Sequence, residues 1–438
     1  MGRRLFGTDG VRGIAGELLS ADLALSLGRA AAATSPAEAP QMLIVRDTRE
    51  SGEMLEAALA AGAAAGGGHA LLAGVLPTPA AAVLVRRYGL DLAAVVSASH
   101  NPYRDNGIKF FGPEGTKLSD EDEERVEAAM EDGRRSAPPI GRVRELHGAA
   151  ADYLRELELR FRELDLSGRR ILLDCANGAT YRVGPEAFRR LGAEVDALGA
   201  EPDGRNINDG CGSTHIELLA ERVPAGGYDL GFAFDGDGDR VLAVDRTGTV
   251  VDGDELMALA ALHLRDRGRL AGDGVVVTVM TNYGFHAAMR REGIEVATTP
   301  VGDRHVLAEL LRRGWALGGE QSGHIIETGF VPSGDGIASA LLVLEALGNR
   351  DLAERSAMRR LPQRLVNVRV PDRDALEGAS EVWEAVEREQ AGLAGRGRVL
   401  VRASGTEPLV RVMVEAPGEA ECEEIAGRLA KEVETQLG

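Results

Sequence analysis

Short, largely apolar runs that stop at small polar residues recur along this chain, and they limit the folds that it can adopt. Such runs lie at Leu92–Val96, Arg170–Asp174 and Leu230–Phe234, and each has the length of a buried strand. Stretches with helical periodicity alternate with runs of this kind along the chain, among them 20–34 and 181–192. This alternation predicts largely parallel sheets that are covered by helices on both faces.

Breaks in this rhythm divide the chain into four predicted domains. The segment 134–148, with its two adjacent prolines, indicates a linker, and the α/β pattern restarts twice before Pro362. After Pro362, strands and long helices give an α+β pattern. We expect three related α/β domains with mixed, largely parallel sheets and a smaller α+β domain, at 1–148, 149–252, 253–361 and 362–438.

The composition is typical of a globular protein and argues against several functions. The chain has 438 residues, enough for several cores, and its net charge of -19 disfavours binding to nucleic acid or to a membrane surface. The stretch 57–85 contains no Asp, Glu, Lys or Arg, but glycines and prolines break it, so we expect helix, strand and helix rather than a membrane span. The 3 cysteines form no CxxC pattern, which predicts neither disulfides nor a zinc site and fits a reducing cytoplasm.

The strand at Leu92–Val96 ends at the turn Ser97-Ala98-Ser99-His100-Asn101-Pro102, where Ser99 is a candidate nucleophile. In open α/β sheets, ligands bind just beyond the carboxyl ends of the strands, which is where this turn places Ser99. A histidine follows it, and a predicted tight turn at Asp105-Asn106-Gly107 presents Lys109 on a short strand. An ordinary strand-ending turn is the competing interpretation.

The strongest local signal is Phe234-Asp235-Gly236-Asp237-Gly238-Asp239-Arg240, in which three carboxylates alternate with glycines after a buried strand. In an extended chain every second residue faces one way, so Asp235, Asp237 and Asp239 should converge. A divalent cation that prefers oxygen ligands, most plausibly Mg²⁺, would offset their repulsion. An EF-hand is disfavoured because arginines stand where that loop needs its glycine and its last glutamate, and a solvated acidic turn is the alternative.

Two further loops carry groups that suit a sugar phosphate. The segment Gly319–His324 offers the Glu320 carboxylate and the Ser322 hydroxyl to sugar hydroxyls, and its histidine has an ordinary pKa suited to proton transfer. The segment Arg402–Pro408, followed by Arg411, combines two hydroxyls, a glycine turn and arginines that can bind phosphate oxygens. A surface loop and a hairpin with incidental arginines are the alternatives. Together the motifs suggest phosphoryl transfer on a sugar.

The segments FGTDGVRG, SASHNP, DGDGDR, GEQSGH and RASGTEPLVR span the chain in this order and resemble the motifs of the α-D-phosphohexomutase superfamily. The resemblance implies three α/β domains and a more mobile fourth domain around a central cleft, with a hinge expected near Leu361-Pro362. It also implies an isomerase that exchanges the 6- and 1-phosphates of a hexose. The forms FGTDGVRG and GEQSGH most resemble the enzymes of the amino sugar, so we expect interconversion of glucosamine 6-phosphate and glucosamine 1-phosphate, towards UDP-N-acetylglucosamine and cell-wall precursors.

The resemblance further implies roles for residues at matching positions. Ser99 is the expected phosphoserine, and through its phosphate it would join Asp235, Asp237 and Asp239 in holding one Mg²⁺ per active site. The expected catalytic residues are Ser99, His100, Lys109, Arg240 and His324, with Lys109 and His324 as acid/base candidates. The expected substrate-binding residues are Thr8, Arg12, Asp303, Arg304, Glu320, Ser322, Arg402, Ser404, Gly405, Thr406 and Arg411. The loop Val301–His305 replaces the histidine-bearing loop of the hexose mutases.

The expected intermediate and activator is glucosamine 1,6-bisphosphate, and the expected protein is a cytoplasmic monomer or homodimer. The nearest alternative is a phosphomannomutase or phosphoglucomutase with the same chemistry. A metal-dependent sugar phosphatase is a second alternative. A sensor of sugar phosphates without catalysis is a third, and it is disfavoured because the nucleophile, the metal motif and the acid/base pair would have no use.

Overall fold

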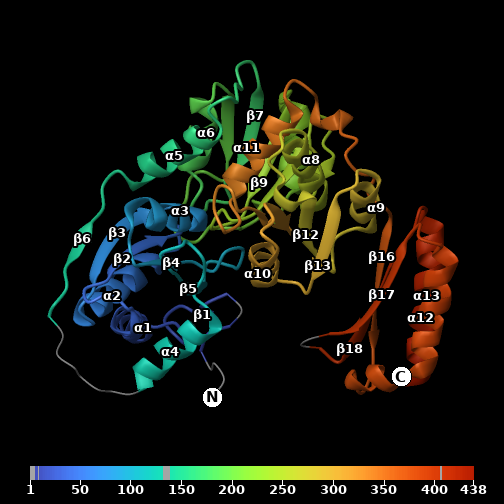
Figure 1. The fold of residues 1–438 in the computed structure, drawn as a ribbon, viewed down its shortest axis with the longest axis horizontal. Coiled ribbons are helices and arrows are strands. Elements are labelled where there is room, and N and C mark those ends of the chain that lie inside the picture. Colours follow the sequence, from blue (N-terminus) through green and yellow to red (C-terminus); the bar gives the residue numbers. More distant parts are fainter. Residues whose placement is uncertain (1–4, 8, 132–138, 405–406) are drawn as a thin grey trace. The chain divides into compact units, whose positions relative to one another are not determined.

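The computed structural model describes residues 5–7, 9–131, 139–404 and 407–438. Contacts divide the chain into two compact units (Figure 1). The first unit consists of Met1–Met280 and Glu295–Arg355, and the second consists of Thr281–Ile294 and Ser356–Gly438. Three of the four sheets belong to the first unit, and each of them combines parallel strands with at least one antiparallel edge.

The first sheet has 6 strands in the order β1-β5-β4-β2-β3-β6, and it carries the turn that contains Ser99. Its central strands are parallel, and β5 and β1 add to one edge in antiparallel fashion. The strands are β1 (Val11–Ile14), β2 (Gln41–Arg46), β3 (His69–Val75), β4 (Leu92–Val96), β5 (Asp105–Phe111) and β6 (Val143–Glu145). The helices are α1 (Ala21–Thr34), α2 (Gly52–Ala65), α3 (Thr78–Tyr88) and α4 (Asp120–Glu131), of which α1 packs against both α2 and α4.

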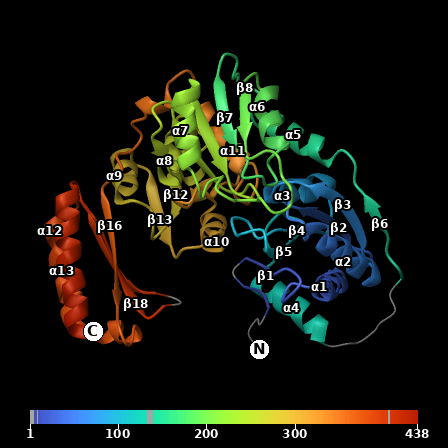
Figure 2. The ribbon, with the colours of Figure 1, turned by 180° about the vertical axis from the view of Figure 1, so that it is seen from behind.

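Two local predictions for this region are wrong. The predicted linker 134–148 contains β6, which pairs in parallel with β3 at the edge of the sheet (Figure 2). The predicted turn at Asp105–Gly107 is instead the start of β5, because the remote strand β1 supplies its hydrogen-bonding partners. The stretch 57–85 forms most of α2, then β3 and most of α3, as predicted. Within the described residues, the model has no helix with the length and apolar character to cross a membrane.

The second sheet has the order β11-β10-β9-β7-β8, and helices lie on either side of it (Figure 2). Leu172 and Ala233 pack against one of these helices, α7, whereas the Phe232 ring lies 5.9 Å from the Phe188 ring of α6. The strands are β7 (Arg170–Asp174), β8 (Glu194–Leu198), β9 (Leu230–Phe234), β10 (Val241–Asp245) and β11 (Val250–Val251). The helices are α5 (Ala149–Arg160), α6 (Val183–Arg190) and α7 (Glu217–Gly226).

The third sheet has the order β13-β12-β14-β15, with only β15 antiparallel to its neighbour. Asp252 begins the first helix of this module, as predicted, because its side chain accepts a hydrogen bond from the Glu255 N–H. The strands are β12 (Gly274–Thr278), β13 (Glu295–Thr299), β14 (Leu317–Gly319) and β15 (Ile325–Glu327). The helices are α8 (Gly253–Asp266), α10 (Asp303–Arg313) and α11 (Gly336–Leu347), with the short 3-10 helices η1 (Ala271–Asp273) and η2 (Leu352–Glu354).

The second unit is built on an antiparallel sheet in the order β16-β18-β17. One face of this sheet packs against two long helices, which lie side by side in both views (Figures 1 and 2). Its elements are α9 (Tyr283–Arg291), β16 (Gln363–Arg369), η3 (Asp374–Gly378), α12 (Ser380–Leu393), β17 (Arg398–Ala403), β18 (Leu409–Glu415) and α13 (Glu419–Leu437). The predicted fold class, three α/β modules and a smaller α+β module, is therefore confirmed, whereas the four domain boundaries stay predictions.

A buried carboxylate joins α9 to the rest of the second unit. Glu415 is fully buried and accepts hydrogen bonds from the Asn282 side chain at 3.2 Å, the Tyr283 N–H at 3.1 Å and Arg398 Nε at 3.0 Å. The Asn282 amide also donates to the Leu361 carbonyl at 3.1 Å and accepts from its N–H at 3.0 Å. Leu361, near which we expected the hinge, is thus held inside the second unit. The unit boundary falls earlier, between Arg355 and Ser356.

Candidate active site

Ser99 lies three residues after the end of β4, in a conformation that few residues other than glycine adopt. Its backbone φ is 53°, and the residue is only 2% exposed. A non-glycine residue in this left-handed region costs about 1–3 kcal/mol and persists only where the surroundings hold it. Its Oγ donates a hydrogen bond to Asp235 Oδ2 at 2.5 Å and lies 3.2 Å from His100 Nδ1. The hydroxyl is therefore fixed between a carboxylate and an imidazole.

A buried arginine holds this turn in place. The Arg49 guanidinium is fully buried and donates to the carbonyl groups of Ser99, Asn101 and Asp105, each at 2.9 Å. Its Nε donates to Asp47 Oδ2 at 2.8 Å. Sequence reasoning missed both charged residues, although they follow β2, the strand beside β4. The rule that ligand-binding groups lie beyond the carboxyl ends of strands could have found them.

We expect replacement of Arg49 by methionine to destabilise the first unit by about 3–5 kcal/mol, because it leaves the Asp47 carboxylate buried without its cation. Urea unfolding measures this loss. The control is Arg205→Met, because Arg205 is 66% exposed and has one surface ion pair, with Glu50. That change should cost no more than about 1 kcal/mol. Equal losses in the two variants would show that Arg49 is not a structural anchor of the turn.

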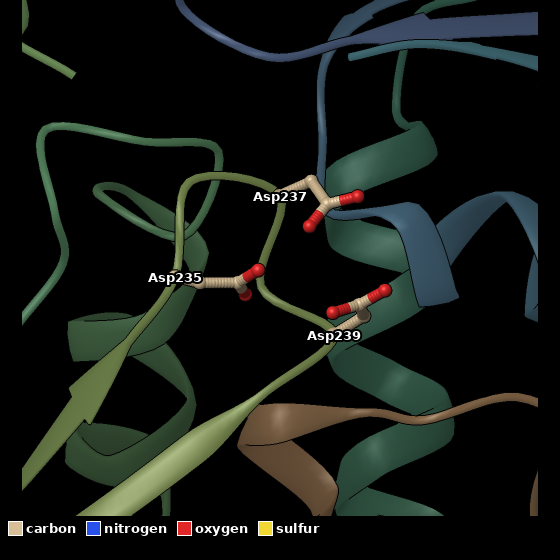
Figure 3. Close-up of side chains that lie close together, drawn as sticks. All are labelled: Asp235, Asp237 and Asp239. Atoms are coloured by element: carbon tan, nitrogen blue, oxygen red, sulfur yellow. The ribbon is translucent and has the colours of Figure 1, made fainter. Parts of the chain in front are cut away.

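The three predicted metal ligands gather at the carboxyl end of β9 (Figure 3). One ligand oxygen from each of Asp235, Asp237 and Asp239 lies within 4.8 Å of the others, and all three residues are buried. Their convergence is confirmed, but the reason that we gave for it is wrong. The loop is not extended: it turns at Gly238, whose φ is 71°, and this turn brings Asp239 back towards Asp235.

The electrostatics of this cluster fit a cation. Burial and the charges of Asp239 and Asp237 raise the pKa of Asp235 well above its ordinary value. Burial also acts to raise the pKa of Asp237, but the charge of Lys109 and the hydrogen bonds from Thr78 and Lys109 together lower that pKa below its ordinary value. Among the described residues, the buried Oδ1 atoms of Asp237 and Asp239 have no hydrogen-bond partner. Clustered carboxylate oxygens without donors are the ligands that Mg²⁺ prefers.

Two basic side chains flank Ser99 and the aspartates. Arg240 NH1 lies 3.2 Å from His100 Nδ1, and the Arg240 backbone N–H donates to Asp235 Oδ1 at 3.2 Å. Burial lowers the pKa of His100, and the charges of Arg240 and Arg12 lower it further, which favours an uncharged imidazole at neutral pH. A guanidinium beside the Ser99 hydroxyl is a suitable partner for phosphate oxygens.

A cavity of about 480 Å³ opens onto Ser99. Eight residues expected from the sequence line it, and they come from all three sheets of the first unit: Arg12, Ser99, Asp239, Arg240, Asp303, Arg304, Glu320 and His324. Asp9, Lys117 and Asp120 also line it, and no motif had singled out Lys117 or Asp120. Its volume lies within the range of cavities that bind small molecules.

Other expected residues lie behind the cavity wall or away from it. Lys109 is 1% exposed, and its Nζ lies 2.9 Å from Asp237 Oδ2 and 3.2 Å from Asp9 Oδ2. Burial acts to lower the pKa of Lys109, but the charges of Asp237 and Asp9 raise it above its ordinary value. Ser322 is exposed and is not part of the cavity lining. Thr8, Gly405 and Thr406 lie outside the described residues.

His324 is buried at the back of the cavity, and both of its ring nitrogens face polar groups. Nε2 accepts a hydrogen bond from the Gly334 N–H at 3.1 Å, and Nδ1 lies 3.6 Å from Asp239 Oδ2. A side chain at position 334 would come within 2.5 Å of the imidazole, so a glycine is needed there. Burial acts to lower the pKa of His324, but the charge of Asp239, its hydrogen bond and the charge of Asp303 together raise the pKa.

The loop before α10 is joined to its surroundings on two sides. The Gly302 N–H donates to Glu320 Oε1 at 3.0 Å, which links this loop to the loop after β14. The Arg304 guanidinium donates to Asp120 Oδ1 at 2.5 Å and also binds Glu123, both on α4. The hydrogen bond from Gly302 thus holds the Glu320 carboxylate in place at the cavity, which is a position suited to orienting a sugar.

In the second unit, two of the expected phosphate-binding residues lie opposite each other on neighbouring strands. Arg402 of β17 pairs directly with Arg411 of β18, which puts two cations on one face of the sheet. Like charges in this position repel each other unless an anion lies between them. Arg411 NH2 lies 3.5 Å from Ser404 Oγ, and its buried Nε has no hydrogen-bond partner among the described residues. This arrangement is suited to phosphate.

Comparison with known proteins identifies the family. The phosphoglucomutase/phosphomannomutase family matches the chain domain by domain, with alpha/beta/alpha domains I, II and III at residues 3–136, 146–248 and 252–365 and its C-terminal domain at 365–432. A phosphoglucosamine mutase of Desulforudis audaxviator is 52% identical and covers 98% of this chain and 97% of its own length. One of Mycobacterium marinum is 50% identical and covers 98% of both chains. The chain therefore belongs to the phosphoglucomutase/phosphomannomutase family and, within it, to the phosphoglucosamine mutases, which are isomerases.

Solved structures agree on the fold. A phosphoglucomutase/phosphomannomutase family protein of Burkholderia thailandensis superposes with a TM-score of 0.83 at 24% identity, over 99% of this chain and 97% of its own. The N-acetylphosphoglucosamine mutase of Aspergillus fumigatus, in complex with GlcNAc-6P and magnesium, gives a TM-score of 0.66 at 18% identity, over 99% and 96% of the two chains. At these identities the similarity shows the fold alone.

Proposed function

We propose that this protein interconverts glucosamine 6-phosphate and glucosamine 1-phosphate in the cytoplasm, through a phosphoserine at Ser99 and a glucosamine 1,6-bisphosphate intermediate. The observation that carries the proposal is the position of the Ser99 hydroxyl, 2.5 Å from a carboxylate of the buried aspartate cluster and at the wall of a sugar-sized cavity. The product would be a precursor of UDP-N-acetylglucosamine. The full-length relatives, which are phosphoglucosamine mutases, support the choice of sugar.

The reaction divides into two phosphoryl transfers. In the first, the phosphoryl group leaves Ser99 Oγ for the free hydroxyl of the sugar phosphate, and the hydroxyl proton passes to a basic side chain of the site. The bisphosphate then turns over, and its other phosphoryl group returns to Ser99. Lys109 and His324 are the acid and base that we propose, and Arg240 stabilises the phosphate oxygens during transfer. Ser99 is almost completely buried, which keeps competing water away from it.

We propose one Mg²⁺ between Asp235, Asp237 and Asp239, with the phosphate of Ser99 as a further ligand. The cation would supply charge stabilisation to the transferring phosphoryl group. The unpartnered Oδ1 atoms of Asp237 and Asp239 support this assignment. Arg12, Asp303, Arg304 and Glu320 line the cavity as the residues that we propose bind the sugar phosphate, together with Ser322 and Thr8. The oligomeric state, a monomer or a homodimer, stays a prediction.

Substrate choice tests the sugar assignment. We expect kcat/KM for glucosamine 1-phosphate to exceed the values for glucose 1-phosphate and mannose 1-phosphate, because the Gly319–His324 and Val301–His305 loops have the amino-sugar form. Steady-state kinetics on the three sugars, with the bisphosphate present, measures this preference. An equal or higher kcat/KM for either neutral hexose would make the protein a phosphoglucomutase or phosphomannomutase. Release of inorganic phosphate at the rate of substrate loss would make it a phosphatase.

A second test concerns the arginines of the second unit. We propose that Arg402, Ser404 and Arg411, with Gly405 and Thr406, bind the phosphate remote from Ser99. Arg411→Ala should weaken substrate binding about tenfold to a hundredfold, because a hydrogen bond to a charged group is worth about 1.5–3 kcal/mol. It should also increase escape of the bisphosphate, which trapping during turnover measures. Arg428→Ala, at a 55% exposed arginine of α13, is the control. Unchanged KM, kcat and bisphosphate escape in Arg411→Ala would exclude this role.

A further inference from the structure

A chain of alternating charges runs from the wall of the active-site cavity to the aspartate cluster, with Lys117 at its centre. Lys117 Nζ lies 2.6 Å from Asp303 Oδ2, and it also binds Asp9 Oδ1. The other oxygen of Asp9 lies 3.2 Å from Lys109 Nζ, which in turn lies 2.9 Å from Asp237 Oδ2. Five side chains thus connect the loop before α10 with the aspartate cluster.

Each carboxylate that binds Lys117 also faces one of the two proposed acid/base residues. Asp303 Oδ2 lies 3.9 Å from His324 Nε2 on one side. Asp9 Oδ2 lies 3.2 Å from Lys109 Nζ on the other. A single ammonium group therefore holds one carboxylate partner of each acid/base residue, although among the described residues it makes no hydrogen bond or ion pair with either of them.

The surroundings of Lys117 show why no other described group could replace it. Lys117 belongs to the segment that connects β5 to α4, and its side chain is 12% exposed. Asp9 keeps Arg12 and Lys109 as cationic partners if Lys117 is removed. Asp303 would keep only the more distant imidazole of His324 and the Arg304 N–H, which donates to its other oxygen at 2.9 Å. Its Oδ2 would then lose its only close cation among the described residues.

Lys117 also lies where three cavities meet. It lines the active-site cavity of about 480 Å³, a cavity of about 390 Å³ beside α1 and α4, and one of about 310 Å³ beside α10. Of the residues that line these cavities, only Lys117 is common to all three. Apolar side chains such as Phe111, Leu307 and Leu311 line the third cavity. Without the Lys117 side chain, the Asp303 carboxylate would gain room to move away from the site.

We propose that Lys117 is a positioning residue of the phosphoryl-transfer reaction, which holds Asp303 and Asp9 and through them orients His324 and Lys109. This inference rests on the proposed function. The segment Thr116-Lys117-Leu118 has no motif that points to a role in catalysis. Only the fold brings its ammonium group between two carboxylates from segments that are more than a hundred residues away on either side.

The test compares three variants with the unaltered chain. Lys117→Met removes the charge and keeps most of the side-chain volume, Lys117→Arg keeps the charge, and Lys431→Met is the control at an exposed lysine of α13. Lys117→Met should lower kcat about tenfold to a hundredfold, because misplacement of catalytic groups by about 1 Å has effects of that size. KM should rise by a smaller factor, because Asp303 is also one of the proposed substrate ligands. Lys117→Arg should recover most of the lost kcat, and Lys431→Met should change neither constant.

Three results would overturn the proposal. The first is an unchanged kcat and KM in Lys117→Met. The second is a raised KM with an unchanged kcat in that variant, which would make Lys117 a substrate ligand. The third is no recovery of kcat in Lys117→Arg. All values are ratios to the unaltered chain on the hexose phosphate that it converts best. A wrong sugar assignment would appear in the unaltered chain, whereas failure of this inference would appear only in the ratios.

A second variant keeps the test decisive if Lys117→Met does not fold, as judged by circular dichroism. Asp303→Asn removes the charge from the other side of the same contact and should also lower kcat about tenfold to a hundredfold, with a rise in KM because it also alters a proposed substrate ligand. Where Lys117→Met folds, the losses of kcat in the double variant should not multiply, because both substitutions remove one interaction. Multiplied losses, or an unchanged kcat in Asp303→Asn, would overturn the proposal.

Discussion

Replacement of Ser99 by alanine should lower turnover by at least about a thousandfold while the protein stays folded, because the covalent route then has no acceptor for the phosphoryl group. No other described hydroxyl can take over this role at the aspartate cluster with the same reach. Thr78 Oγ1 lies 2.6 Å from Asp237 Oδ2, but Thr78 is buried and does not line the cavity. The loss should therefore appear in kcat.

Coupled assays of glucosamine 1-phosphate formation measure this loss, and circular dichroism shows that the fold is kept. Ser167→Ala, at an exposed serine of the first unit, is the control and should turn over like the unaltered chain. The left-handed backbone at residue 99 gives alanine no new strain relative to serine, so stability should change little. Turnover within tenfold of the unaltered chain in Ser99→Ala would exclude Ser99 as the nucleophile.

Removal of divalent cations should have the second large effect. A chelator should abolish turnover and added Mg²⁺ should restore it, because Asp235, Asp237 and Asp239 are buried together and two of their oxygens have no hydrogen-bond partner among the described residues. A second readout does not depend on activity. Since Mg²⁺ binds the folded protein, a concentration of about 100 times its Kd should stabilise the protein by about 2.7 kcal/mol and raise Tm.

The variant Asp239→Asn should lose most of this rise in Tm together with turnover. Its control is Glu121→Gln, which removes one carboxylate from the exposed, acidic start of α4 and should keep both. Full turnover after exhaustive chelation, with metal analysis confirming removal, would contradict the assignment. A Tm that rises equally with Mg²⁺ in Asp239→Asn and in the unaltered chain would contradict it as well.

Much of the fold followed from local pattern. The strands Leu92–Val96, Arg170–Asp174 and Leu230–Phe234 have the bounds that we predicted, because fully buried parallel strands appear in the sequence as apolar runs. The two wrong local predictions concern β6, which is an edge strand of the first sheet, and β5, which pairs with the edge strand β1. The strand β6 is short and exposed, so it has no apolar signal, and its pairing with β3 depends on a segment some seventy residues away. The start of β5 looked like a turn because Asp-Asn-Gly favours turns where no partner strand is available.

The candidate site was predictable where chemistry is concentrated in a short motif. Ser99, Asp235, Asp237 and Asp239 come together as expected, since each motif ends a buried strand. Single residues were not predictable. Arg49 and Lys117 belong to no motif, and their roles depend on which remote carbonyl and carboxylate groups the fold brings to them. A motif can be placed at the end of a strand from the sequence, but the charged groups that remote segments bring next to it cannot.

The most direct test of the central claim, that Ser99 passes its phosphoryl group to the sugar, is a single-turnover experiment. The protein is first labelled at Ser99 with radioactive phosphate from glucosamine 1,6-bisphosphate, and peptide mapping verifies the position of the label. Unlabelled glucosamine 6-phosphate is then added, and the label is located at short times. Our account predicts that the label leaves Ser99 and appears first in the bisphosphate, with little inorganic phosphate. A label that stays on Ser99 while glucosamine 1-phosphate forms, or that appears directly as inorganic phosphate, would contradict it.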